Sequence, residues 1–269
     1  MNADPHPAKR LSWLGTRARS RIANTVKVAP SKLNLIPLYV GGSFGSKYVL
    51  GKVIAIAAML AKVSGRPVKF MEDRIDNLVA CENLASDRYY DSELAITRDG
   101  LFKSLRVRVV DDYGAYFQFG HATHGNALAQ ATGPYRIQSL AYTVQCVLTN
   151  KCQQGVFRGA GSDGGNFNLE RLVDAAAQEP GLDPIEIRRR NFIQPDQFPY
   201  KIPCGNIYDS GNYPAVLDKA LSMADYEGLR RMQSEARQQG RYVGIGLATA
   251  HQTASTVLPS SGSGTTARA

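Results

Sequence analysis

Gly41-Gly42-Ser43-Phe44-Gly45-Ser46-Lys47 is the stretch that decides the fold. Residues with high β-propensity precede it at 35–40, and an apolar run follows at 49–63, so the order is strand, glycine loop and helix. Glycine permits positive φ and lets the backbone approach a ligand closely. Because the first N–H groups of a helix have no partner within the helix, this stretch predicts a cradle for an anionic group.

Two common phosphate-binding loops do not fit this stretch. A Walker A loop needs a second glycine before the lysine and a Ser or Thr after it, but Ser46 and Tyr48 stand at those positions. The Gly-x-Gly-x-x-Gly spacing of a dinucleotide-binding loop is also missing. Taken alone, the loop is equally consistent with a glycine-rich turn that binds nothing.

The composition is that of an ordinary globular protein, with 269 residues of which 43% are hydrophobic and 20% charged. The net charge of +9 suits a nucleic acid, an anionic cofactor or an acidic partner subunit. The longest basic run, Arg188–Arg190, is explained by a solvated helix end, and no nucleic-acid-binding motif accompanies it. We therefore expect no nucleic-acid partner.

Targeting and redox features favour a cytoplasmic protein. Residues 1–10 contain no apolar signal core, and the apolar run at 49–63 carries two lysines and is short for a bilayer, so no membrane span is expected. None of the four cysteines are spaced as Cys-x-x-Cys, which argues against zinc or an iron–sulfur cluster on this chain. Reduced, structural thiols are the expectation.

The remaining pattern predicts an α+β fold, with mixed sheets and packed helices. Residues 88–97 and 101–110 form two strands joined at Arg98-Asp99-Gly100, a tight turn in which glycine supplies positive φ. We expect no strong structure in residues 1–20, and Phe117–Gln130 is ambiguous. Further strands are expected at 26–40 (broken at its prolines), 68–71, 141–148 and 242–250, and further helices at 48–64, 183–191 and 213–239.

A second glycine-rich loop, Gly-Val-Phe-Arg-Gly-Ala-Gly-Ser-Asp-Gly-Gly, occupies residues 155–165 and also precedes a helix. Apolar residues from Leu169 to Ala176 recur at helical spacing, and Pro180-Gly181 ends this helix. Asp183 is then the expected N-cap of the next helix, with Pro184 at its first position. Two glycine loops more than 100 residues apart, each before a helix, need a common explanation.

Together with the second loop, the pattern resembles the molybdenum-binding subunit of the molybdenum hydroxylases, the xanthine dehydrogenase and aldehyde oxidase family. The first loop is similar to the family's Gly-Gly-x-Phe-Gly-x-Lys cofactor loop, and Phe157–Gly161 is similar to its second pterin loop. The resemblance runs from about Leu14 to Leu247. Other motifs that follow the family's order are Asp112–Tyr116, Gly133–Tyr135, Thr149–Lys151, Glu170–Leu172, Asp183-Pro184 and Arg189–Asn191.

The resemblance implies an oxidoreductase that hydroxylates an electron-poor carbon, in an aldehyde or an aromatic N-heterocycle, with oxygen derived from water. Its cofactor is implied to be molybdopterin, in the mononucleotide or the cytosine dinucleotide form, buried between the two loops. Electrons are implied to leave through iron–sulfur clusters on a small subunit and FAD on a medium subunit. The cofactor carries the difficult chemical step, and the protein positions and tunes it.

The resemblance places the cofactor contacts at Gly42, Ser43, Phe44, Gly45, Phe157, Arg158 and Gly159. Phe44 and Arg158 are implied to lie near the molybdenum, without ligating it through their side chains. A fixed guanidinium at Arg158 suits anionic oxo groups better than lysine does. The alternatives are a structural ion pair for Arg158 and ordinary core positions for Phe44 and Phe157.

Departures from the family pattern bear on activity. Ser162-Asp163-Gly164 replaces the Arg-Pro-Glu that often continues the second loop. Gly159 stands where carbon monoxide oxidisers carry a copper-binding cysteine, and Tyr48 stands where xanthine oxidisers carry an acid, so neither substrate is expected. The family's general-base glutamate has no match here and is expected beyond the end of the chain, so no catalytic residue is assigned within it.

The expected organisation is a basic flank at 1–25, a first molybdopterin-binding domain at 26–193, an incomplete second domain with its connection at 194–254, and a disordered tail at 255–269. This makes the chain one internal piece of a larger subunit, with the missing remainder as a partner. The alternative is a catalytically inactive truncated fragment that acts at most as a cofactor- or subunit-binding module. A phosphate-binding NTPase is a weaker alternative because of Tyr48.

His121 and His124 invite the idea of a metal site on side chains. Nothing in the sequence places carboxylates or further histidines beside them, so ligand identity and number are not met. The family also keeps its metal on the pterin. We therefore expect no protein-ligated metal at these two histidines.

Overall fold

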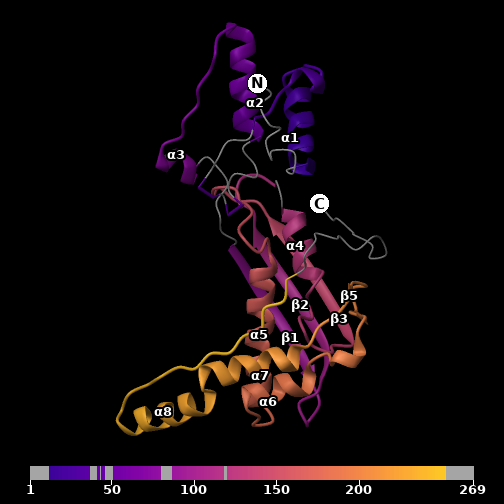
Figure 1. Ribbon diagram of the computed structural model, residues 1–269, viewed down its shortest axis with the longest axis vertical. Helices are drawn as coiled ribbons and strands as arrows, with labels where there is room; N and C mark the ends of the chain where they lie inside the picture. The colour runs from indigo at the N-terminus through magenta and orange to yellow at the C-terminus, as the bar shows by residue number, and fades with distance from the viewer. Residues whose placement is uncertain are drawn as a thin grey trace, which may run out of the picture. The chain divides into compact units, whose positions relative to one another are not determined.

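The computed structural model describes residues 12–36, 41–42, 44–45, 51–79, 87–117 and 120–252 (Figure 1). These residues divide into two compact units, each described by itself below. The first unit draws on residues 1–85, 114–118 and 150–158, and the second on 86–113, 119–149 and 159–269. No helix within these described ranges is long and apolar enough to cross a membrane.

The first unit contains the helices α1 (Ser12–Thr25), α2 (Gly51–Ser64) and α3 (Arg74–Val79), and the short 3₁₀ helix η2 (Pro30–Lys32). Ile22 and Ala23 on α1 are buried, and α1 packs against α2. Lys62 on α2 donates a hydrogen bond to the carbonyl of Val26 at 2.8 Å. As predicted, α2 ends just before Gly65, which adopts a φ of +65°.

Three expectations for this unit are wrong. Residues 12–20 belong to α1. This helix is stabilised by packing of its buried face, and the scattered arginines of the sequence give no sign of that face. Residues 26–36 hold a turn and η2 in place of a strand, and 68–71 form no strand because no described segment pairs with them. The expectations for 37–40, and for a helix beginning at 48, fall outside the described residues.

A three-stranded mixed sheet forms the centre of the second unit, in the order β1-β2-β3. β1 (Asp87–Ile96) pairs antiparallel with β2 (Phe102–Asp112), and Gly100 in the intervening turn has a φ of +80°. β3 (Ser139–Val147) pairs parallel with β2. Parallel neighbours need a crossover connection, and this one contains α4 (Gly120–Leu128), the segment that the sequence left ambiguous. The predicted hairpin and third strand are confirmed.

The core lies between one face of this sheet and α5 (Ser162–Gln178), which Figure 1 shows running along the strands. Leu105, Val107 and Val109 alternate along β2 with exposed charged residues, so a single face of the strand is buried. Leu169 and Val173 of α5 belong to the same buried cluster. Each such side chain contributes roughly 1.5–3 kcal/mol when it is fully buried.

α6 (Pro184–Asn191) begins as predicted, because the Asp183 carboxylate accepts the N–H of Ile185 at 2.7 Å. Asn191 at its end is buried and ties the helix to the hairpin. Its side-chain oxygen accepts the N–H of Phe102 at 2.7 Å, and its amide nitrogen donates to the carbonyls of Gly100 and Ile187, both at 2.8 Å.

A buried ionic cluster joins several of the motifs that carry the family resemblance. Arg188 is fully buried and donates from Nε and Nη2 to Glu170 Oε2 at 3.1 and 2.8 Å. The hydroxyl of Tyr135 donates to Glu170 Oε1 at 2.6 Å. Burial, reinforced by the charge of Glu170, raises the pKa of Tyr135 well above its ordinary value. Removing one partner from such a pair leaves an uncompensated buried charge, so these residues have a structural role and stabilise the fold.

The chain continues through η4 (Pro195–Gln197) and the short hairpin β4 (Tyr200–Lys201) and β5 (Ile207–Tyr208) to α7 (Tyr213–Ala224) and α8 (Tyr226–Gln238). The single helix expected at 213–239 is therefore two helices. Asp225 separates them with a φ of +46°, and its carboxylate accepts the N–H of Gly228 at 3.2 Å. Aspartate tolerates this left-handed conformation better than most residues do.

The strand expected at 242–250 has no partner strand among the described residues, so no strand is formed. The expected disordered tail at 255–269 falls outside the described residues.

Candidate functional site

The first glycine loop has a backbone that ordinary residues rarely adopt. Gly42 and Gly45 have φ values of +130° and +116°, and Phe44 between them has +51°. The ring of Phe44 is 60% exposed and lies over Gly42, since a Cβ on Gly42 would be 3.2 Å from the ring atom Cε2. The ring is thus not a core aromatic in this structure. Ser43 falls outside the described residues.

The two predicted loops lie in direct contact inside the first unit. A Cβ built on Gly45 would be 1.8 Å from the carbonyl oxygen of Val156 and 3.3 Å from the Cα of Phe157. Real Cβ atoms do not approach other atoms so closely, so only glycine permits this backbone-to-backbone contact. Two segments more than 100 positions apart, both singled out from sequence as glycine loops, are thereby brought side by side.

Two other family-like motifs hold the segment that leads into the second loop. The N–H of Ala115 donates to the carbonyl of Lys151 at 3.0 Å. A Cβ on Gly114 would lie 2.2 Å from the carbonyl oxygen of Cys152, so the two backbones touch there as well. These contacts of Gly114 and Ala115 therefore fix the chain at Lys151 and Cys152, just before residues 155–158.

The second loop is divided between the two units after Arg158. In the first unit, Phe157 is 46% exposed and Arg158 is exposed. In the second unit, Gly159, Ala160 and Gly161 all have positive φ, at +103°, +48° and +99°, immediately before α5. Consecutive residues in this conformation turn the chain sharply into the start of the helix, where the N–H of Ser162 donates to the carbonyl of Gly159 at 3.0 Å.

Arg158 makes no ion pair or hydrogen bond with any residue in the described parts of the chain. This removes the structural ion pair as an explanation for the residue within those parts. An exposed guanidinium that has no partner among the described residues is suited to a planar or multiply charged oxyanion.

Helix α4 holds the part of the second loop that belongs to the second unit. A Cβ on Gly161 would lie 2.1 Å from the carbonyl oxygen of Thr123, and Asn126 Nδ2 donates to the carbonyl of Ala160 at 3.1 Å. The amide of Gln130 also donates to the hydroxyl of Ser162. The loop is therefore fixed from the α4 side at three successive residues.

A buried polar network supports α4 in turn. Asp111 at the end of β2 is fully buried and accepts from Arg88 Nε at 3.0 Å. His124 Nε2 lies 2.6 Å from the same carboxylate oxygen, and Arg88 Nη2 donates to the Thr123 hydroxyl at 2.7 Å. His124 is thus part of a structural network. The side chain of His121 is not described, and the described residues contain no group of three or more His, Cys, Asp or Glu side chains arranged for a metal.

The residues of the first unit fit an anionic ligand at the two loops. The positive-φ glycines expose backbone where a side chain would obstruct it, and Arg158 supplies a cation. Gln153, two residues before the second loop, is buried, and its Nε2 has no acceptor among the described residues. Buried donors in that state are uncommon in native proteins and need an explanation.

Sequence reasoning missed the residues that hold the part of the second loop belonging to the second unit. Asn126 and Gln130 lie in a segment with ambiguous secondary structure, and Arg88 and Asp111 read as ordinary strand residues. Their roles depend on contacts between residues 23 to 35 positions apart. The positions of the two loops, by contrast, follow from local glycine patterns.

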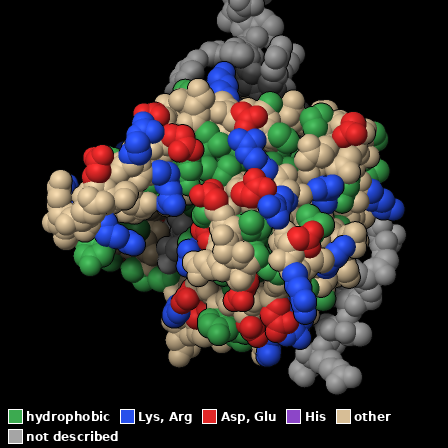
Figure 2. Space-filling view, turned by 90° about the horizontal axis from the view of Figure 1, so that it is seen from below, with side chains coloured by type: hydrophobic (Ala, Val, Ile, Leu, Met, Phe, Trp, Pro, Cys, Tyr) green, Lys and Arg blue, Asp and Glu red, His purple; other side chains and the backbone are tan. Residues whose placement is uncertain are grey.

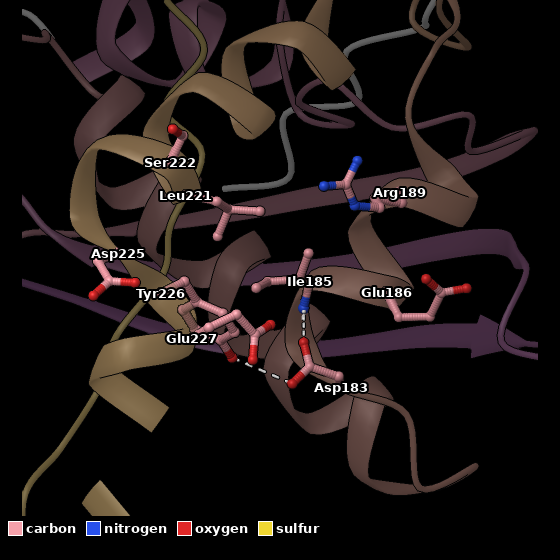
Figure 3. Close-up of a pocket in the computed structure, with 9 residues that line it drawn as sticks. All are labelled: Asp183, Ile185, Glu186, Arg189, Leu221, Ser222, Asp225, Tyr226 and Glu227. Atoms are coloured by element: carbon pink, nitrogen blue, oxygen red, sulfur yellow. Dashed lines mark hydrogen bonds between the residues drawn. The ribbon is translucent and has the colours of Figure 1, made fainter. Parts of the chain in front are cut away.

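A separate cavity of about 610 Å³ lies in the second unit, between α6 and the junction of α7 and α8 (Figure 3). Two of its acidic side chains cap helices of the protein itself. Asp183 caps α6 and accepts the hydroxyl of Tyr226 at 3.2 Å, and Asp225 caps α8. Arg189 pairs with Asp218 outside the group of lining residues. None of the residues assigned to cofactor binding lines this cavity.

Positive and negative side chains are mixed on the face of the molecule that Figure 2 shows. Figure 2 shows acidic and basic side chains interspersed over one face, without a continuous basic patch. On this face the net positive charge is not concentrated in the way that nucleic-acid backbones require.

The family described as "Molybdopterin cofactor-binding domain" matches residues 14–192. The chain is 38% identical over 234 residues to the carbon monoxide dehydrogenase large chain of Hydrogenophaga pseudoflava, covering 82% of this chain and 28% of that one. It is 33% identical over 221 residues to the nicotine 6-hydroxylase large subunit of Paenarthrobacter nicotinovorans, covering 81% of this chain and 27% of the relative.

Among solved structures, quinoline 2-oxidoreductase from Pseudomonas putida 86 is similar with a TM-score of 0.77 and 32% sequence identity. That similarity covers 84% of this chain and 29% of the other. The chain therefore spans less than a third of the length of these relatives.

Proposed function

Since this chain belongs to the molybdopterin cofactor-binding domain family of the molybdenum hydroxylase large subunits, we propose that its two glycine loops hold a molybdopterin cofactor in an enzyme that hydroxylates an electron-poor carbon. The oxygen is derived from water, and the substrate is an aromatic N-heterocycle or an aldehyde. The cofactor contacts are Gly42, Ser43, Phe44, Gly45, Phe157, Arg158 and Gly159.

The contact between Gly45 and Val156 carries this proposal. It brings the exposed Phe44 loop against the segment that ends in Phe157 and Arg158, as a ligand held from two sides requires. The cofactor, when bound, supplies the redox and oxygen-transfer chemistry. The glycine backbone binds and orients it, and Arg158 holds its negative charge through charge-assisted hydrogen bonds. Phe44 and Phe157 exclude water from the metal without ligating it.

Among substrates, we favour an aromatic N-heterocycle. Relatives named for nicotine and quinoline support this class. Although a carbon monoxide dehydrogenase is also similar, Gly159 occupies the position that the resemblance assigns to its cysteine. Gly159 has a φ of +103°, a conformation that strains any residue with a Cβ, so this loop is not shaped for cysteine.

We further propose that the chain works inside a cytoplasmic complex. The remainder of the large subunit supplies the general-base glutamate, and iron–sulfur and FAD subunits remove the electrons. Residues 26–193 and 194–254 then correspond to a first domain and the start of a second domain that bind the cofactor, in the mononucleotide or cytosine dinucleotide form. The relatives are named as large chains or large subunits, which supports this assembly.

Substitution of Arg158 tests the proposal in the complex purified through this chain. We expect Arg158→Ala to lower the molybdenum and pterin content roughly tenfold, because a hydrogen bond to a charged group contributes about 1.5–3 kcal/mol. Metal analysis and fluorescence of the oxidised pterin measure this content. Arg171→Ala is the matched control, since that side chain is 68% exposed on α5 with only a 3.8 Å contact to Asp174.

Equal cofactor content in the two variants contradicts the role of Arg158. A wild-type complex without molybdenum or pterin contradicts the whole proposal. It would then favour the second candidate, a catalytically inactive fragment that binds subunits.

A further inference from the structure

Residues 243–252, which follow α8, have the burial pattern of a strand although they belong to no sheet. Odd-numbered side chains from Val243 to His251 are partly buried, and even-numbered ones from Gly244 to Gln252 are exposed. A strict period of two is the signature of an extended segment with one packed face. Figure 1 shows this segment turning back from α8 along α7 towards α5.

Side chains of the second unit hold this segment along one edge. Gln233 donates to the carbonyl of Val243 at 2.8 Å, and Arg188 Nη2 donates to the carbonyl of Leu247 at 3.0 Å. Glu170 accepts both the N–H and the hydroxyl of Thr249, at 2.9 and 2.6 Å. Asn166 bonds the N–H and the carbonyl of His251 at 3.4 and 3.0 Å. The buried Glu170–Arg188 pair therefore serves as a template for the segment.

All of these backbone bonds fall on odd-numbered residues. In an extended strand the N–H and C=O of one residue point to the same edge, and those of the next residue point to the opposite edge. Within the described residues, no hydrogen bond is made by the backbone of the even-numbered positions Gly244, Gly246, Ala248 and Ala250. Among the described residues, the segment thus presents a second edge whose backbone hydrogen-bonding groups have no partner.

The even-numbered residues from Gly244 to Ala250 are exposed and have small side chains or none. A Cβ added to Gly244 or Gly246 would meet nothing within 4 Å. No lysine or proline, the residues that commonly protect an exposed strand edge, occurs from 242 to 252. Another backbone can therefore approach this edge without obstruction.

We propose that residues 243–251 are the docking edge for an extended segment of the polypeptide that completes the large subunit, which adds to it as a neighbouring strand. This inference rests on the proposed function, in which the chain works with that remainder. The chain spans 28% of the carbon monoxide dehydrogenase large chain, so most of such a subunit lies outside it. Affinity comes from main-chain hydrogen bonds to the even-numbered residues, which depend little on sequence.

Strand-length synthetic peptides test the proposal on the purified full chain. The peptides overlap and cover the part of the Hydrogenophaga pseudoflava large chain that this chain does not match. We expect at least one peptide to slow amide hydrogen exchange at Gly244, Gly246, Ala248 and Ala250 by about tenfold, equivalent to about 1.4 kcal/mol. The amides of Thr249 and His251 are already bonded and should change little.

A pair of substitutions at Ala248 separates edge pairing from other binding. Ala248→Pro removes one N–H from the unused edge and suits an extended chain, whereas Ala248→Thr keeps that N–H. Peptide protection should be lost in the first variant and kept in the second, with equal melting temperatures. Protection that survives Ala248→Pro, or no protection by any peptide, overturns the proposal.

Sedimentation equilibrium tests whether a second copy of the chain occupies the edge instead. If the chain self-associates and Ala248→Pro abolishes the self-association, the occupant is a second copy, and the assignment to the remainder of the subunit is overturned. None of these measurements depends on bound molybdenum. The inference and the proposed function can therefore fail separately.

Discussion

Phe44 and Ala160 are non-glycine residues with positive φ, and each lies in one of the two glycine loops. Such conformations cost of the order of 1–3 kcal/mol and persist where the surrounding structure enforces them. Asn126, which bonds the carbonyl of Ala160, is one source of that enforcement. The presence of such a residue in each of the two loops is consistent with a backbone shaped for a ligand.

The contact between the two loops is sensitive to substitution at Gly45. We expect Gly45→Ala to separate the two loops, because its Cβ would meet the carbonyl of Val156 at 1.8 Å and its φ of +116° disfavours any side chain. The expected cost is about 2 kcal/mol or more in the first unit. It should be seen as faster amide exchange at residues 155–158 and a lower midpoint of chemical denaturation.

Gly41→Ala provides the control, since a Cβ there meets nothing within 4 Å and its φ is not positive. If the two variants exchange and unfold alike, the close contact at Gly45 does not hold the loops together.

At the residue level the sequence predicted the loops but not their supports. Gly42, Gly45 and Gly159 follow from a local requirement for positive φ, which a glycine pattern reveals. Arg88, Asp111 and Asn126 act through partners distant in sequence, and nothing local marks them.

Among the elements, those with local chemistry at their ends were predicted correctly. The β1–β2 hairpin has its Asp-Gly turn, and α6 has Asp183 as its cap followed by proline. Elements that depend on packing were not predicted. α1 gains its stability from a buried face, and Asp225 interrupts 213–239 although the surrounding pattern remains helical.

The segment 243–251 should loosen in mild acid because of His251. Burial lowers the pKa of His251 below its ordinary value, and its ring faces Tyr208 of β5 at 4.3 Å and Tyr213 of α7 at 6.1 Å. The unfolded state therefore binds the proton more tightly, so the stability contributed by neutral His251 is present above about pH 6.5 and is lost as the pH falls further. The pH dependence of the segment's stability should correspond to the uptake of at most about one proton.

Amide exchange at Thr249 and His251, corrected for intrinsic rates, measures this effect between neutral and mildly acidic pH. His251→Phe keeps a ring against Tyr208 but cannot titrate, so its exchange should lose the acid-dependent increase. The same pH dependence in both proteins would show that another group is responsible.

For the whole molecule, the order of motifs along the chain identified the family correctly, and residues of these motifs make contacts inside each unit. Gly114 touches the backbone of Cys152, and Asn191 anchors the hairpin to α6. Their order is read directly from sequence, whereas the division into two units depends on contacts between distant segments.

The purified chain alone should not turn over substrate. Its length is less than a third of that of its relatives, and we expect the general base and the electron-transfer groups from other polypeptides. Dye reduction with N-heterocycles and aldehydes measures this, and the complex purified through the same chain is the positive control. Clear substrate-dependent reduction by the isolated chain would place the complete machinery within these 269 residues.

The contact between Gly45 and Val156 also constrains when a ligand can be captured during translation. Because more than 100 residues separate the two positions, the first loop leaves the ribosome roughly 5–20 s before its counterpart is made. Throughout that interval half of the cradle exists without the other half. Under the proposed function, loading of the cofactor is therefore a late event in the life of the nascent polypeptide, and a factor that delivered the molybdenum group would meet a chain whose sheet has already been synthesised.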